Sequence, residues 1–178
     1  MFVYNVAAQG TKFGITAGYM NANAKLDFVL LKDTYTESGF YIGGFADFSL
    51  TNTFHIQPEL LYASSGVVDS GIIIIPLLAK YYLTKNINIQ AGPHFDILTN
   101  SLADELTSGS SLDELIADVL NDNYTRVGIS LTTGLGYDIG THFFMEARYA
   151  FQLNDYYTGD LGVSATANTL MVGLGYKF

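Results

Sequence analysis

Five charged residues could do chemistry because they stand inside segments otherwise made of apolar and small residues: Asp47, Glu59, Lys80, Glu146 and Arg148. Three are acids and two are bases, and an unpaired buried charge costs several kcal/mol. We therefore predict that the two glutamates pair with the two cations and that Asp47 lies nearby. Such a cluster could be a structural plug, or it could form a gate or a proton path.

The residue types of common active sites are scarce or badly spaced. The chain has no cysteine, which excludes disulfides, thiolate zinc sites and cysteine nucleophiles. Its three histidines, His55, His94 and His142, lack metal-ligand spacing, and no nucleophile elbow or phosphate-binding loop is present. His94 and Asp96 are two positions apart, which favours a hydrogen-bonding pair over a catalytic one. We predict no catalytic residue, no cofactor, no metal site and no enzyme.

The elements that position the charged residues are predicted to be β-strands, because apolar residues recur at every second position from Thr11 almost to the end. Eight segments follow this pattern, each of roughly ten residues, which suits a tilted membrane strand better than a globular one. Short turns are expected at 51–53, 84–86 and 140–142, and long connections at 23–37, 64–70, 99–123 and 155–166. This alternation predicts an all-β, eight-stranded antiparallel up-and-down transmembrane barrel.

The composition fits a membrane wall. Only 14% of the 178 residues are charged, against about 25% in an ordinary soluble domain, while 49% are hydrophobic. The longest apolar run, 71–79, contains Pro76 and is about half of what a membrane helix needs. The net charge of −9 argues against a nucleic-acid partner, since a phosphate backbone requires a basic footprint.

Two all-β interpretations assign the strand faces oppositely. A soluble lipocalin-like barrel turns its apolar face inward, and a membrane barrel turns it toward lipid. The second face here consists mostly of Gly, Ser, Thr, Gln and Tyr, without the abundant Lys, Glu and Arg of a water-facing strand. Aromatic residues of the apolar face gather near both strand ends, as in interfacial girdles. The pattern favours the membrane barrel.

Several short motifs carry a family resemblance, at 39–48, 56–62, 75–82, 90–93, 134–137, 146–149 and 173–178. Together they resemble the PorT-type outer-membrane β-barrel family, with small OmpX/OmpA-like eight-stranded barrels. The resemblance implies an outer-membrane protein of a Gram-negative bacterium. The terminal Gly173, Tyr176 and Phe178 also resemble the signal that the barrel-assembly machinery reads.

The long connections hold most of the charge. They contain twelve acids and two lysines, a balance of −10, and the rest of the chain sums to about +1. Ser111 and Glu114 form a capping box before an apolar stripe, which predicts a short helix over 111–120 in the third long connection. This helix could pack on the barrel, lie on the membrane or dock a partner. The acids lack a calcium-loop spacing and are interpreted as solvating groups, although they could bridge to lipopolysaccharide through divalent cations.

We expect residues 1–8 to be a signal-peptide remnant, because 6–8 fit a signal-peptidase site, and residues 9–178 to form one barrel domain. The predicted protein is a filled, monomeric outer-membrane barrel with extracellular long loops and periplasmic termini. Its expected role is structural, adhesive or surface-interacting, with lipid, lipopolysaccharide, assembly machinery and a loop-bound protein as partners. The alternatives are a small channel or transport-accessory barrel that uses the lumen charges, and a lipid-modifying enzyme.

Overall fold

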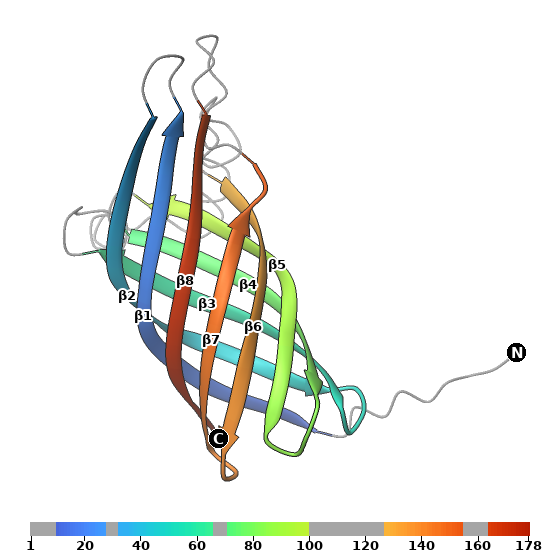
Figure 1. Cartoon of the computed structure of the whole chain (residues 1–178). Coiled ribbons are helices and arrows are strands. Elements are labelled where there is room, and N and C mark those ends of the chain that lie inside the picture. The colour runs from blue at the N-terminus through green and yellow to red at the C-terminus, as the bar shows by residue number, and fades with distance from the viewer. Residues whose placement is uncertain (1–9, 28–31, 66–70, 100–126, 155–163) are drawn as a thin grey trace, which may run out of the picture.

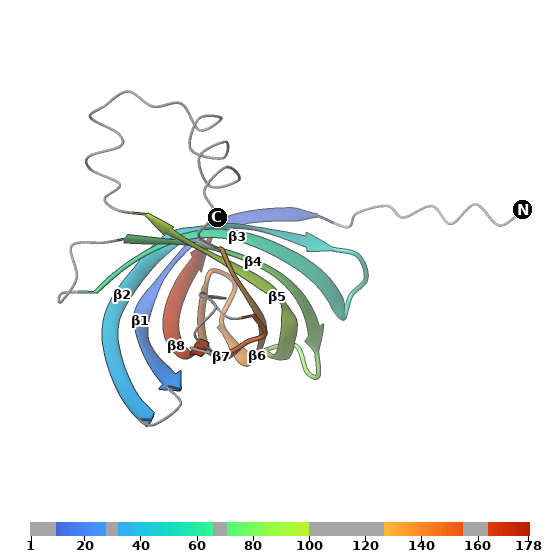
Figure 2. The same ribbon diagram turned by 90° about the horizontal axis from the view of Figure 1, so that it is seen from above.

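The fold is a closed antiparallel β-barrel of eight strands in sequence order (Figures 1 and 2). The computed structural model describes residues 10–27, 32–65, 71–99, 127–154 and 164–178. The strands are β1 Thr11–Asp27, β2 Lys32–Ser49, β3 Phe54–Ser65, β4 Gly71–Tyr82, β5 Ile87–Thr99, β6 Val127–Ile139, β7 Phe143–Gln152 and β8 Ser164–Lys177. Each strand pairs with its neighbours along the chain, and β1 closes the barrel on β8. The predicted up-and-down barrel is confirmed.

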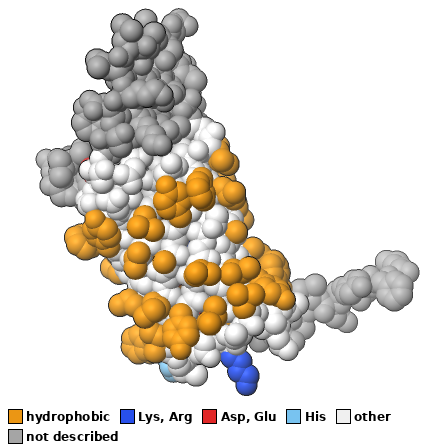
Figure 3. All heavy atoms as spheres, viewed as in Figure 1, with side chains coloured by type: hydrophobic (Ala, Val, Ile, Leu, Met, Phe, Trp, Pro, Cys, Tyr) orange, Lys and Arg blue, Asp and Glu red, His pale blue; other side chains and the backbone are white. Residues whose placement is uncertain are grey.

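The two faces of every strand have opposite character, and the apolar face points outward. Phe40 is 72% exposed and Leu135 is 59% exposed, whereas Arg148 and Lys80 are each 2% exposed. Hydrophobic side chains are spread along the outside of the barrel (Figure 3). This inversion excludes the lipocalin-like arrangement, because a soluble barrel buries its apolar face. No helix in the described part of the chain is long and apolar enough to cross a membrane.

The three short turns lie where the sequence predicts them. In two of them a threonine side chain closes the turn, since Thr51 Oγ1 accepts the backbone N–H of Phe54 at 2.9 Å and Thr84 Oγ1 accepts that of Ile87 at 3.0 Å. In the third, Gly140 has a φ of 70°, a left-handed conformation that costs glycine little. These turns hold the hairpins at one end of the barrel together.

The first long connection is much shorter than predicted, because β1 and β2 continue to pair as far as Asp27 and Lys32. The prediction of a loop over 23–37 is therefore wrong. The apolar alternation stops near Tyr19, but polar side chains continue the pairing on the same face: the Tyr19 hydroxyl donates to Ser38 at 2.7 Å, and Thr36 donates to Asn23 at 2.9 Å. Strand β8 also begins earlier than predicted, at Ser164.

As a result, β1, β2 and β8 extend past the rest of the barrel at the end opposite the short turns (Figure 1). We call this three-stranded part the extended sheet. It comprises the described residues 21–27 of β1, 32–38 of β2 and 164–168 of β8. The predicted signal-peptide remnant at 1–8 and the predicted helix at 111–120 lie outside the described residues.

Candidate functional site in the lumen

The lumen holds a buried ion cluster built on Arg148 of β7. Its Nη1 and Nη2 donate to the two carboxylate oxygens of Glu59 on β3, each at 2.6 Å, and Nη2 also donates to Glu146 at 2.6 Å. Gln57 donates to Glu59 at 2.5 Å, and Thr16 donates to Glu146 at 3.4 Å. A two-pronged arginine–carboxylate contact is among the strongest and most directional polar interactions in proteins. The cluster therefore links opposite walls of the barrel.

The other two residues of the sequence-based hypothesis form no hydrogen bond with this cluster among the described residues. Lys80 is 2% exposed, and its Nζ lies 5.3 Å from the centre of the Phe144 ring. No carboxylate in the described strands forms an ion pair with Lys80. Asp47 is bound by His55 instead, with Nδ1 and Oδ1 2.7 Å apart. Both glutamates thus form their ion pairs with Arg148, and in the described strands neither forms one with Lys80.

A second ion pair, which the sequence reasoning missed, lies nearer the short turns. Lys177 Nζ donates to Asp138 at 2.7 Å, and the Tyr82 hydroxyl donates to the same carboxylate at 3.1 Å. The sequence did carry a signal for this pair. Both Asp138 and Lys177 occupy inward positions of the alternating pattern near the short-turn end.

An apolar layer adjoins the ion cluster on the side of the long connections. It consists of Met20, Tyr41, Leu61, Ala63, Ile74 and Met171. Met171 is the register partner of Arg148 on β8, and Leu61 follows Glu59 by two residues on β3. Ions crossing the lumen would therefore have to pass both an apolar layer and a paired charge layer.

Glycines make room for the large lumen side chains. A Cβ atom at Gly175 would lie 2.1 Å from the Phe144 ring, and one at Gly14 would lie 2.2 Å from the Phe45 ring. The two rings meet edge to face, with centroids 5.4 Å apart. This close packing matches the expectation that an eight-stranded barrel is just wide enough for side chains to fill it.

One buried group of three residues places a hydroxyl, an imidazole and a carboxylate in a row, as a nucleophilic catalytic site does. His94 Nδ1 lies 2.9 Å from the Thr132 hydroxyl, and its Nε2 lies 2.7 Å from Asp96. A catalytic hydroxyl must be reachable, yet Thr132 is 0% exposed and His94 is 2% exposed. The geometry supports a hydrogen-bonded chain inside the wall.

The residues of the predicted assembly signal lie at the end of β8. Phe178 is 70% exposed, and its ring centroid is 5.6 Å from that of Tyr176. Gly173 faces inward, where a Cβ would lie 2.0 Å from the Tyr41 hydroxyl oxygen. Gly173 therefore has a packing role of its own within the lumen.

Comparison with known protein families fits this geometry. Residues 7–158 match the family described as outer membrane protein β-barrel domain. The chain belongs to this family. Its location is accordingly the bacterial outer membrane, with the apolar wall described above in contact with lipid.

Several solved structures are similar to this chain at low sequence identity. Neisserial surface protein A is 16% identical, with a TM-score of 0.51, over 96% of this chain and 100% of that protein. The attachment invasion locus protein Ail of Yersinia pestis is 15% identical, with a TM-score of 0.49, over 94% of this chain and 98% of Ail. The N-terminal barrel of Pseudomonas aeruginosa OprF is 15% identical, with a TM-score of 0.45, over 90% of this chain and 97% of the OprF barrel. A comparison with curated proteins gave no match.

Proposed function

We propose that this protein is a non-conducting, non-enzymatic outer-membrane barrel that acts through its external surface, in adhesion, surface contact or envelope integrity. The observation that carries the proposal is the filled lumen. Arg148 joins β7 to Glu59 on β3 across the interior, and the apolar layer covers this cluster on one side. In this proposal the ion cluster is a structural plug.

The extended sheet is the surface proposed to make the contact. Strand β3 accompanies β2 only as far as Gly39, and β7 accompanies β8 only as far as Thr169. Among the described strands, residues 32–36 of β2 and 164–167 of β8 thus pair with a strand on one side only. Unpaired strand edges add strands from another chain through main-chain hydrogen bonds. A protein partner with an extended segment would fit this surface.

The proposal includes an orientation and a membrane context. Long connections and the extended sheet face outward, where the acidic residues meet lipopolysaccharide and its counterions, and both termini face the periplasm. The barrel-assembly machinery recognises Gly173, Tyr176 and Phe178. Membership of the PorT-type branch rests on the motifs at 39–48 and 75–82 and belongs to the same proposal.

Planar-bilayer recording of the refolded protein tests the proposal. We expect no steady conductance from the wild-type barrel, because the charge layer and the apolar layer both obstruct ions. The matched sample is the same protein with Leu61→Gly and Met171→Gly, which opens the apolar layer but leaves Arg148 in place. A large steady wild-type conductance would overturn the closed-lumen function.

One observation favours a channel or transport-accessory role as a second candidate. Lys80 is buried with an aromatic ring as its described partner, and Arg148 Nε makes no hydrogen bond among the described atoms. A buried charge with incomplete partners is costly, so a second arrangement that supplies the missing partner can compete with the first. Brief openings that disappear in Lys80→Met, with no change in the folded fraction, would support this role.

A further inference from the structure

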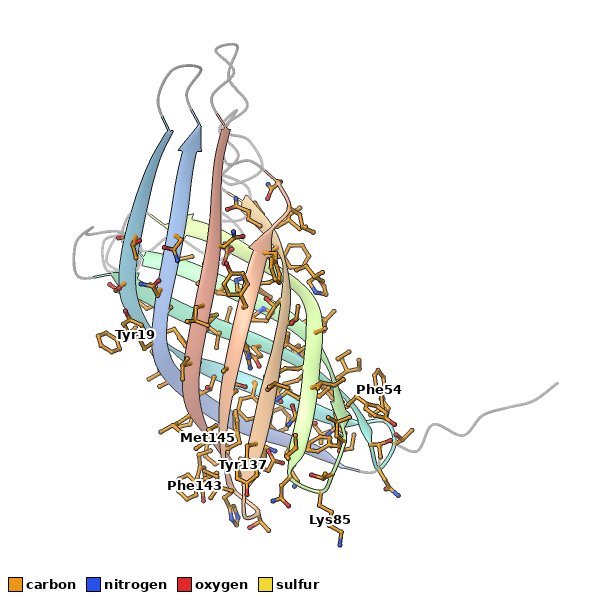
Figure 4. All side chains as sticks on the ribbon, viewed as in Figure 1. Tyr19, Phe54, Lys85, Tyr137, Phe143 and Met145 are labelled. Atoms are coloured by element: carbon orange, nitrogen blue, oxygen red, sulfur yellow. The ribbon has the colours of Figure 1, made fainter. Side chains whose placement is uncertain are left out.

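The short-turn end of the barrel contains a polar pocket of about 210 Å³. It lies between the ends of β1, β2, β3, β4, β6 and β8 and the turns at 51–53 and 84–86. Figure 4 shows Lys85 on the β4–β5 turn at this end. The volume equals about seven water molecules at ~30 Å³ each. It suits one small polar group and is too small for a drug-sized ligand.

The pocket concentrates the cations of an acidic protein. Three of the eight Lys and Arg residues of the chain line it, namely Lys12, Lys85 and Lys177, although the net charge of the chain is −9. Two acids, Asp47 and Asp138, also line it. The lining is therefore positive at neutral pH even when His55 is counted as neutral.

The two acids are already matched by buried partners. Asp138 accepts hydrogen bonds from Lys177 at 2.7 Å and from Tyr82 at 3.1 Å. Asp47 is held by His55 Nδ1 at 2.7 Å. Lys177 offsets the charge of Asp138, so with His55 neutral the pocket keeps the charge of Asp47 against those of Lys12 and Lys85.

The two remaining lysines lie at the exposed mouth of the pocket, and Lys12 is the strand-register partner of Asp47 on β2. Neither Lys12 nor Lys85 takes part in an ion pair within the described part of the chain, and both are exposed. Two ammonium groups that line one pocket repel each other, and an anion between them would remove this repulsion. Nε2 of His55, which also lines the pocket, makes no hydrogen bond among the described atoms.

From this arrangement we propose that the pocket binds a small anion bearing a phosphate or carboxylate group. Lys12 and Lys85 hold the charge at the mouth, and Lys177 adds positive potential from within. Such a group could come from a free solute or from the headgroup of an anionic phospholipid in the adjacent leaflet. The site is independent of the extended sheet and of whether the lumen conducts.

The test is a titration of the folded barrel in maltoside micelles with inorganic phosphate, followed by amide chemical shifts at constant ionic strength. We expect saturable shifts at the short-turn end. The double variant Lys12→Gln, Lys85→Gln should bind phosphate at least tenfold more weakly. The matched control, Lys25→Gln with Lys32→Gln, removes the same charge at the opposite end and should leave binding unchanged.

Heat-modifiable gel migration confirms that both double variants are folded. Shifts that grow linearly with phosphate, or an equal loss of affinity in both double variants, would overturn the site. A second arm measures by native mass spectrometry the retention of phosphatidylglycerol over phosphatidylcholine in nanodiscs. Preferential retention that depends on Lys12 and Lys85 assigns the anion to lipid, and saturable phosphate binding without this preference assigns it to a free solute.

Discussion

The outer wall and the lumen are built from alternate residues of the same strands, yet they are stabilised in different ways. On β7, Met145 and Ala147 face outward, while Glu146 and Arg148 face inward. Any apolar side chain is suitable on the outer wall, because lipid chains form no specific polar contacts. The lumen depends on particular partners, since each buried charge requires a group of opposite charge or a hydrogen bond. The stability cost of a substitution should therefore depend on the loss of its partners in the lumen, and on its depth in the membrane on the outer wall.

The largest effect should follow from removing the central cation. Arg148→Met leaves Glu59 and Glu146 buried without their shared partner, and we expect a loss of about 3–5 kcal/mol in the free energy of unfolding. Urea unfolding in lipid vesicles measures it. Adding Glu59→Gln and Glu146→Gln to the same protein should recover most of the loss. A single variant as stable as wild type would contradict the partner-dependent view of the lumen.

A charge on the wall should cost less, and its cost should depend on depth. Leu135→Arg, near the middle of the exposed apolar band, should destabilise the barrel by about 2–4 kcal/mol. Leu153→Arg, just beyond the end of β7, should cost about 0–1 kcal/mol because the side chain reaches the interface. The same unfolding assay compares the two. Equal costs at both positions would show that the band does not span lipid as described.

Adding one methyl group distinguishes the two faces more finely. Gly175→Ala places a Cβ 2.1 Å from the Phe144 ring and 2.9 Å from the Ile15 carbonyl oxygen, and should cost about 1–3 kcal/mol. Gly44→Ala is the control, since the nearest atom that its Cβ would meet is the Gly14 carbonyl oxygen at 3.7 Å. If both variants were equally stable, the lumen would be less tightly packed than the geometry indicates.

The smallest effect is expected in the extended sheet, outside both environments. Asn23→Ala removes the exposed hydrogen bond from Thr36 and the long one that Asn23 donates to Asn21, and should change the free energy of unfolding by less than about 0.5 kcal/mol. Vesicle unfolding again provides the measurement. A loss above 1 kcal/mol would mean that the extension contributes to barrel stability, which the comparison of wall and lumen does not predict.

Strands and faces could be predicted from the sequence because alternation is a local property. Each strand reveals its outward face without reference to any other strand. The prediction of a loop over 23–37 was wrong because it relied on this local pattern. Apolar alternation ends near Tyr19, while backbone pairing continues through polar residues such as Asn23. An apolar pattern indicates contact with lipid, and β1 and β2 continue to pair past their last apolar positions.

The choice of charge partners is a non-local property, and the sequence could not supply it. Glu59 and Arg148 lie on strands four apart, so their contact depends on the tilt and register of the whole barrel. Judged only by distance from the short turns, Lys80 is as good a candidate partner for the glutamates as Arg148. The geometry instead puts Lys80 over the Phe144 ring, and it pairs Lys177 with Asp138 through the closing strand.

Closure of the barrel between β1 and β8 requires the correct register of β8. These strands pair from Gly14 with Lys177 to Asp27 with Ser164, and the pairing joins the two ends of the barrel sequence. A shift by one residue would turn every β8 side chain to the opposite face, which would send Lys177 toward lipid and Leu174 into the filled lumen. The pairing of β8 with β1 therefore depends on the register of all seven preceding strands, and the barrel closes only when that register is correct.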